Sequence, residues 1–191
     1  MARRNARETN SEGLSVKDEK PVSEQPSSSD FGAGAMVMHP LYGIGTVEKI
    51  EEKDILGKVN RFSIISFQND RLKIMVNMEQ KNNLIRNLIA REEIPRVLNF
   101  IRECKSELPI KSSERYNVNL KKIKSSDIYQ LSEVIKDLSL LSREKKLSPK
   151  EVNMLKQSKK MLAMEFGYVS SISQEDAEMM IEASCKSDIE A

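Results

Sequence analysis

The stretch from Lys111 to Phe166 constrains the fold most, because it combines helix-start signals with helical spacing of apolar residues. Ser148 can accept hydrogen bonds from backbone N–H groups, Pro149 suits the first helical position, and Glu151 stands where it closes a capping box. Apolar side chains then recur at helical spacing: Val152, Leu155, Leu162 and Phe166. This pattern predicts a helix that begins after Ser148 and is stopped by Gly167.

The segment before this helix predicts a second one, from about Ser126 to Leu141. Its apolar residues fall on one side of a helix: Ile128, Leu131, Val134, Ile135, Leu138 and Leu141. Because only the short turn 142–147 joins the two helices, we expect an antiparallel pair.

Charge is distributed unevenly along the chain. Residues 111–166 hold thirteen Lys and Arg against seven Asp and Glu, whereas residues 167–191 hold one Lys against six acids. A concentrated basic face attracts a phosphate backbone, because binding releases condensed counterions. A solvated lysine face is the alternative interpretation, since surface helices commonly carry lysine beside glutamate.

Length and composition limit the class of protein. The 191 residues suit one or two domains, and no apolar run approaches the roughly 20 residues of a membrane helix. Without a signal-peptide pattern, we expect a soluble cytoplasmic protein. Cys104 and Cys185 are expected to be free thiols, and His39, the single histidine, a packed or turn residue. We expect neither a metal nor a cofactor.

The first thirty residues are rich in Ser, Glu, Asn and Pro and contain few large aliphatic side chains. Such a composition buries too little apolar surface to offset the entropy of ordering, so we expect a disordered tail over residues 1–30. A second short tail is expected over 187–191.

Strand patterns begin after Phe31 and predict four short strands, at 35–38, 46–55, 61–67 and 72–76. Glycines at 43, 45 and 57 and the segment 68–71 supply the turns. Four strands over this length predict a small, strongly bent antiparallel sheet or barrel. The pair Gly43 and Gly45 lacks the third glycine and the following helix of a dinucleotide-binding motif.

Helical patterns replace the strands after Val76. Ile94, Val97, Leu98 and Ile101 form one apolar stripe, and a last helix is predicted from Ser173 with acids in its first turn. The fold class predicted is therefore α+β, with a small antiparallel barrel over 31–82 and an all-α helical domain over 83–186.

Two patterns resemble the CarD/CdnL family of bacterial transcription regulators. The residues of the first are Phe31, Gly34, Val37, Pro40, Gly43, Gly45 and Val47, followed by strands around Gly57. Those of the second are Arg115-Tyr116, Asn119-Leu120, Val134, Asp137-Leu138, Leu147-Ser148 and Leu155. The resemblance extends from Phe31 to about Ser184 and implies a Tudor-like N-terminal domain before the helical domain.

The resemblance also implies partners. In this family the Tudor-like domain binds the β subunit of RNA polymerase, largely by adding to a sheet edge, which is where backbone groups are left unpaired. By position, the basic residue of the polymerase-facing hairpin falls on Lys53. A second basic contact falls on Met75, whose thioether cannot supply a charge.

The helical domain of the family lies against promoter DNA upstream of the bubble, and many members wedge a tryptophan into the minor groove. The matching position here is Ser112, which lacks the apolar bulk of a wedge. Ile110 or Tyr116 are the alternatives near the bubble, although Tyr116 also fits an apolar core. DNA contacts are expected at Arg115, Lys121, Lys122, Lys124 and Lys150, with Lys145 and Lys146 as further candidates.

Three functions remain open at this point. The first is a polymerase-bound regulator, expected to be monomeric, that contacts promoter DNA weakly and without sequence preference and stabilises the open complex. The second is an adaptor that binds polymerase and recruits a protein through its helices. An enzyme comes last, because the sequence offers no nucleophile with a base, no metal cluster and no phosphate loop.

Overall fold

The computed structural model describes residues 31–67, 72–80, 84–104 and 108–186, and it confirms the α+β class. An antiparallel sheet comes first along the chain, and helices follow it. The two tails predicted over 1–30 and 187–191, and the turn predicted over 68–71, lie outside the described residues.

Within the described ranges, five strands form one antiparallel sheet in the order β4-β3-β2-β1-β5. Their bounds are β1 Met36–His39, β2 Gly43–Ile55, β3 Lys58–Phe67, β4 Leu72–Asn77 and β5 Arg86–Asn87. All four predicted strands are present. The sequence did not predict β5, which has two residues and pairs with β1 through Val37 and Met38. The sheet therefore extends beyond residue 82, and its described pairing leaves β4 and β5 at the edges.

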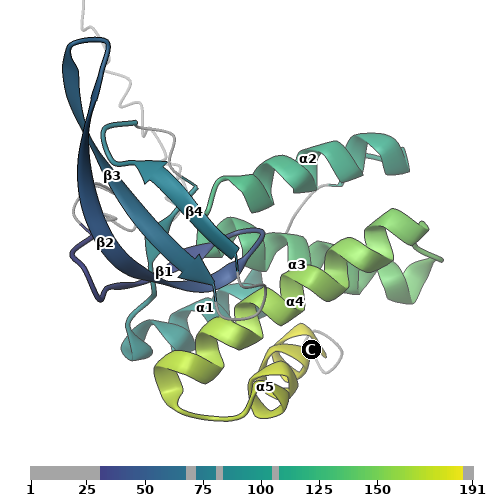
Figure 1. Cartoon of the computed structure of the whole chain (residues 1–191). Helices are drawn as coiled ribbons and strands as arrows, with labels where there is room; N and C mark the ends of the chain where they lie inside the picture. The colour runs from purple at the N-terminus through teal and green to yellow at the C-terminus, as the bar shows by residue number, and fades with distance from the viewer. Residues whose placement is uncertain (1–30, 68–71, 81–83, 105–107, 187–191) are drawn as a thin grey trace, which may run out of the picture.

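The β2–β3 hairpin is long, and a two-residue turn closes it (Figure 1). Leu56 and Gly57 form the turn with positive φ angles of 54° and 79°, as a tight hairpin turn requires. The carboxylate of Asp54 accepts a hydrogen bond from the Gly57 N–H at 2.8 Å. Leucine is rarely found at positive φ, so the backbone geometry of this turn does not account for a leucine at position 56.

His39 is packed at the β1–β2 turn, as the sequence predicts. Its Nδ1 accepts hydrogen bonds from the N–H groups of Leu41 and Tyr42, at 3.1 and 3.3 Å. The ring stacks on Tyr42 with centroids 4.5 Å apart and meets Phe67 edge-on. Burial lowers the pKa of His39, which keeps the ring neutral and able to accept these bonds.

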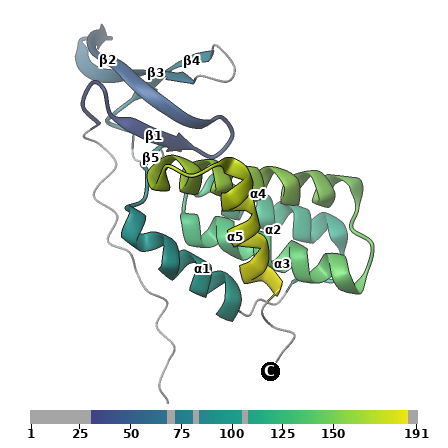
Figure 2. The same ribbon diagram turned by 90° about the horizontal axis from the view of Figure 1, so that it is seen from below.

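In the part of the chain that the structure describes, five α-helices and one 3₁₀ turn follow the sheet. Their bounds are η1 Arg91–Glu93, α1 Ile94–Glu103, α2 Ser112–Lys124, α3 Ile128–Glu144, α4 Pro149–Ser170 and α5 Gln174–Lys186. Figure 2 shows the sheet on one side of the helices, with β1 and β5 nearest to them. One core joins the two parts, because Met38 of β1 packs among apolar residues of α1, α3, α4 and α5.

The longest helix, α4, begins as predicted but ends later. Ser148 and Glu151 form the full capping box, and Pro149 takes the first position. Gly167, however, does not stop the helix, which continues to Ser170 and ends with Ser171 in the left-handed conformation at φ 57°. A side-chain carbon at position 167 would lie 3.2 Å from the carbonyl oxygen of Ile172, so this glycine admits the α4–α5 turn.

A buried ion pair ties the sheet to the helices. The guanidinium of Arg86 on β5 meets both carboxylate oxygens of Glu165 on α4, at 2.5 and 2.6 Å. Arg86 also donates to the carbonyl oxygen of Ser126 at 2.7 Å, and Glu165 accepts the N–H of Ile89 at 3.0 Å. Arg86 is 9% exposed and Glu165 is fully buried. We call this set the interdomain lock.

We predict that Arg86→Met destabilises the protein by about 3–5 kcal/mol, because it leaves the Glu165 carboxylate buried without its cation. Urea unfolding measures this change in the free energy of unfolding. As a control, Lys73→Met breaks the exposed Lys73–Glu48 pair and is expected to have little effect. Equal effects of the two substitutions would contradict this role for the lock.

Candidate functional site

The outer face of the sheet brings together the two positions that the family resemblance assigns to polymerase binding. Lys53 on β2 and Met75 on β4 are separated by strand β3, yet the Lys53 ammonium lies 3.3 Å from the Met75 sulfur. Lys53 also lies 3.5 Å from Glu51. Met75 is 52% exposed, so this face combines an exposed thioether with charged groups.

Strand β4 forms the edge of the sheet next to this face. Lys73 and Met75 point to the outer face, while Leu72, Ile74 and Val76 pack into the sheet core. Within the described strands, only β3 pairs with β4, so its other side offers backbone groups for an added strand. An exposed edge beside Lys53 is the arrangement that strand addition needs.

The tip of the β2–β3 hairpin adds an apolar element. Leu56 is fully exposed, and Ile55 and Val59 are 47% and 57% exposed. Exposed aliphatic side chains that gather on a projecting hairpin are typical of protein contacts rather than of a solvated turn. The sequence signal for this tip was two aliphatic residues directly before Gly57.

In the helical part, the N-terminal ends of α2 and α4 lie side by side. The hydroxyl groups of Ser112 and Ser148 lie 3.1 Å apart, so the start of α2 adjoins the turn between α3 and α4. Exposed lysines border this place on both sides. We call Lys111, Lys145, Lys146 and Lys150 the basic end.

Arg115 is buried beside the basic end rather than exposed on it. Its side chain is 5% exposed, and its Nε and Nη2 atoms each lie 2.9 Å from Glu151 Oε1. Its Nη1 donates to the carbonyl oxygens of Pro109 and Ile110. With these N–H groups bonded inside the protein, Arg115 links the start of α2 to the cap of α4.

The other predicted DNA-contact residues differ in how free their charges are. Lys122 is half-buried between two acids, 3.1 Å from Glu133 and 3.4 Å from Asp137. Lys121 and Lys124 are exposed on α2, and Lys150 is exposed with its ammonium 5.6 Å from the centre of the Tyr116 ring. Tyr116 packs beside the core of α2, α3 and α4, as its apolar neighbours predict.

Glu151 receives several hydrogen bonds at the helix starts. Burial alone would raise its pKa, but hydrogen bonds from Ser148, Ser112 and Arg115 stabilise the carboxylate and hold the pKa below its ordinary value. One carboxylate thus serves the cap of α4 and the guanidinium of Arg115 together.

Ile110 is the most exposed apolar residue of the helical part, at 91%. Arg115 holds its carbonyl oxygen, so a buried charge fixes the backbone from which this side chain projects. Ser112, the position that matches the family tryptophan, instead uses its hydroxyl in the hydrogen bond to Ser148. The exposed apolar side chain at this end of the helices is therefore that of Ile110, two residues before Ser112, where the resemblance places the tryptophan.

Comparison with known proteins identifies the two parts of the chain. Residues 31–89 match the CarD-like/TRCF RID domain, and residues 96–182 match the CarD C-terminal domain. The chain is also 25% identical over 145 residues to the candidate transcription factor YdeB of Bacillus subtilis (strain 168), covering 75% of this chain and 95% of that protein. The chain belongs to the CarD family of transcription regulators, and its N-terminal domain is of the kind that interacts with RNA polymerase.

Across the described ranges, no group of three or more His, Cys, Asp and Glu side chains is arranged to hold a metal ion. In the same part of the chain, no helix combines the length and apolar character needed to cross a membrane.

We predict that Glu151→Gln lowers stability at neutral pH by about 2 kcal/mol, because charge-assisted hydrogen bonds are lost. The folded-state pKa of Glu151 lies below the unfolded one, so this stabilisation is present above about pH 4.3 and is lost as the pH falls through the folded pKa. The difference in the free energy of unfolding between wild type and variant should therefore decrease at acidic pH.

Urea unfolding between pH 3 and pH 7 measures that difference. Glu144→Gln, at an exposed position on α3, is the matched control and should show a small and constant difference. A Glu151→Gln difference that stays constant across this pH range would contradict the account of the buried carboxylate.

Proposed function

We propose that this protein is a nonenzymatic, cytoplasmic regulator that binds the β subunit of RNA polymerase and contacts upstream promoter DNA to stabilise the open complex. The observation that carries the proposal is the rigid joining of a sheet with an open edge to a helical part with a basic end. Such a body can hold DNA at a fixed place relative to polymerase. It acts as a monomer and needs no cofactor.

The polymerase surface is the edge strand β4 with Lys53 and Met75 beside it. Backbone hydrogen bonds along β4 supply affinity that is independent of side chains, while Lys53 adds a charge. Because Met75 has no charge, the thioether contributes apolar contact, and the exposed side chains of the hairpin tip extend the same surface.

The DNA surface is the basic end, with Lys121 and Lys124 farther along α2. These ammonium groups are exposed, as phosphate contacts require, and such contacts position a protein without reading sequence. Affinity for free DNA should therefore be weak and should fall steeply with salt. Arg115 and Lys122 support the helices and are left out of the contact set.

Ile110 takes the place that the resemblance gives to the wedge at Ser112. It is exposed and apolar, and it lies next to Lys111 and two residues before Ser112, which contacts Ser148 beside the other lysines of the basic end; these lysines would hold the flanking phosphates. Apolar side chains act as wedges by filling an opened base step, where unstacking costs a few kcal/mol. Isoleucine is smaller than tryptophan, so we expect a weaker wedge.

A polymerase-bound adaptor is the second candidate. The pairing of Lys122 and the burial of Arg115 leave fewer free charges on α2 than the sequence indicates, which favours it. In that case polymerase binding persists, but the helical part recruits a protein instead of holding the promoter.

We predict that Lys53→Glu lowers affinity for the β subunit at least tenfold, because it puts an acid beside Glu51 on the binding face. Biolayer interferometry with immobilised β subunit measures the dissociation constant. Lys160→Glu, the same charge change at an exposed position on α4, should leave it unchanged. Equal affinity of wild type and Lys53→Glu would overturn this placement.

We predict that Ile110→Ser shortens the lifetime of the open complex while binding to polymerase is retained. The measurement is fluorescence of a melting reporter in promoter DNA, after a competitor is added to polymerase with wild-type or variant protein. Val118→Ser, which removes an exposed aliphatic group on α2 itself, is the control and should match wild type.

The outcomes of this experiment separate the two candidates. A wild-type protein that binds polymerase and leaves the lifetime unchanged would support the adaptor. If wild type and Ile110→Ser lengthen the lifetime of the open complex equally, the regulator function is supported but Ile110 is not the wedge.

A further inference from the structure

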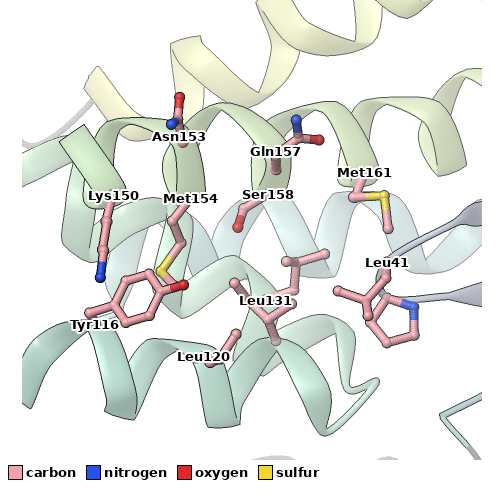
Figure 3. A pocket seen from close by; sticks show the side chains of 12 residues that line it. Leu41, Tyr116, Leu120, Leu131, Lys150, Asn153, Met154, Gln157, Ser158 and Met161 are labelled. Atoms are coloured by element: carbon pink, nitrogen blue, oxygen red, sulfur yellow. The ribbon is translucent and has the colours of Figure 1, made fainter.

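A cavity of about 370 Å³ lies between α2, α4 and the β1–β2 turn (Figure 3). Its walls are mostly apolar: Leu41, Leu120, Ile123, Leu131, Met154 and Met161. The volume falls within the roughly 300–1,000 Å³ of small-molecule sites, which are also mainly apolar with a few placed polar groups. Two methionines suit such a site, because their unbranched side chains adapt to a ligand's shape.

Ser158 supplies a polar group deep in this cavity. The residue is 2% exposed, and its hydroxyl oxygen has no hydrogen-bond partner in the described part of the chain. Figure 3 shows the hydroxyl directed from α4 into the space between α4 and α2. Buried polar groups are nearly always paired, so the unpaired Ser158 hydroxyl is available to accept a hydrogen bond from, or donate one to, a molecule in the cavity.

Lys150 supplies the charge at the other end. It lines the cavity beside the Tyr116 ring, and no Asp or Glu belongs to the lining. In the described part of the chain, no carboxylate lies within ion-pair distance of its ammonium. A ligand with an anionic group would therefore be attracted to this end. Eight residues of helix, about 12 Å, separate Lys150 from Ser158.

We propose that this cavity binds a small amphipathic carboxylate, with its anionic head at Lys150, an apolar body against the methionines, and a second polar group at Ser158. An apolar side chain from a partner protein fits less well, because it would offer no charge to the Lys150 ammonium and no hydrogen-bond partner to the Ser158 hydroxyl. The site is separate from the polymerase surface on the sheet, and its ligand binding can be measured on the protein alone.

The test uses 10-hydroxydecanoate, which has a carboxylate and a hydroxyl at opposite ends of a ten-carbon chain. Its neutral match is 1,10-decanediol. Full-length protein carrying ¹³C-methyl methionine is titrated with each compound and followed by NMR. Met154 and Met161 report from the cavity, and Met179, which is 62% exposed on α5, is the internal control.

We expect saturable shifts of the Met154 and Met161 methyl signals with 10-hydroxydecanoate and none at Met179. The diol should bind roughly tenfold more weakly, and Lys150→Met should cause a similar loss for the acid, because each removes a charge-assisted contact. Ser158→Ala should weaken binding of the acid several-fold. Lys156→Met, an exposed lysine on α4 outside the lining, should leave affinity unchanged.

Three results would overturn the proposal. One is the absence of saturable shifts at Met154 and Met161 in the wild-type protein. Another is equal affinity for the acid and the diol with no effect of Lys150→Met, which would describe an apolar docking groove instead. Leu120→Trp fills the cavity without changing charge, so saturable shifts that survive in this variant would also place the ligand elsewhere.

Discussion

The ion pair between Arg86 and Glu165 determines how the two parts of this protein work together. It lies out of water, joins the last strand of the sheet to the longest helix, and uses further hydrogen bonds to the backbone at Ser126 and Ile89. A buried charge pair of this kind tolerates little displacement, because moving either partner leaves the other unpaired. The position of the sheet on the helices is therefore fixed by geometry as well as by apolar contact.

This fixed position gives the proposed function its mechanism. The proposed polymerase contact at β4 would orient the whole body and present the basic end and Ile110 at one place without a separate docking step. Lysine contacts with phosphate are weak and sequence-blind when they act alone. Attachment to polymerase would raise their effective concentration at the promoter, so that weak contacts would suffice.

Local signals in the sequence predicted much of this structure. The capping box at Ser148, the apolar stripes of the helices and the alternation of the strands depend on near neighbours, and each is present. The prediction that Gly167 ends α4 is wrong, because α4 continues to Ser170. The role of this glycine depends on the close approach of the Ile172 carbonyl, which spacing along the chain does not reveal.

The sites were harder to predict because they depend on partners distant in sequence. Arg115 has the charge of a phosphate contact, but Glu151, on another helix, turns it into a buried anchor. The sequence places Lys53 and Met75 22 positions apart, and only the sheet brings them together. The cavity at Ser158 required the packing of α2 against α4 to be known, and the two-residue strand β5 is too short to carry a pattern.

The most direct test of the account measures whether the sheet and the helices form one body in solution. Spin labels at Lys49→Cys on β2 and Lys146→Cys at the basic end allow the distance distribution to be measured by pulsed electron resonance. Burial raises the pKa of Cys104 to about 11 and raises that of Cys185, so neither native thiol should compete for the label at neutral pH. The account predicts one narrow distribution. A broad or two-peaked distribution in the otherwise unaltered protein would show that the interdomain lock does not hold, and would contradict it.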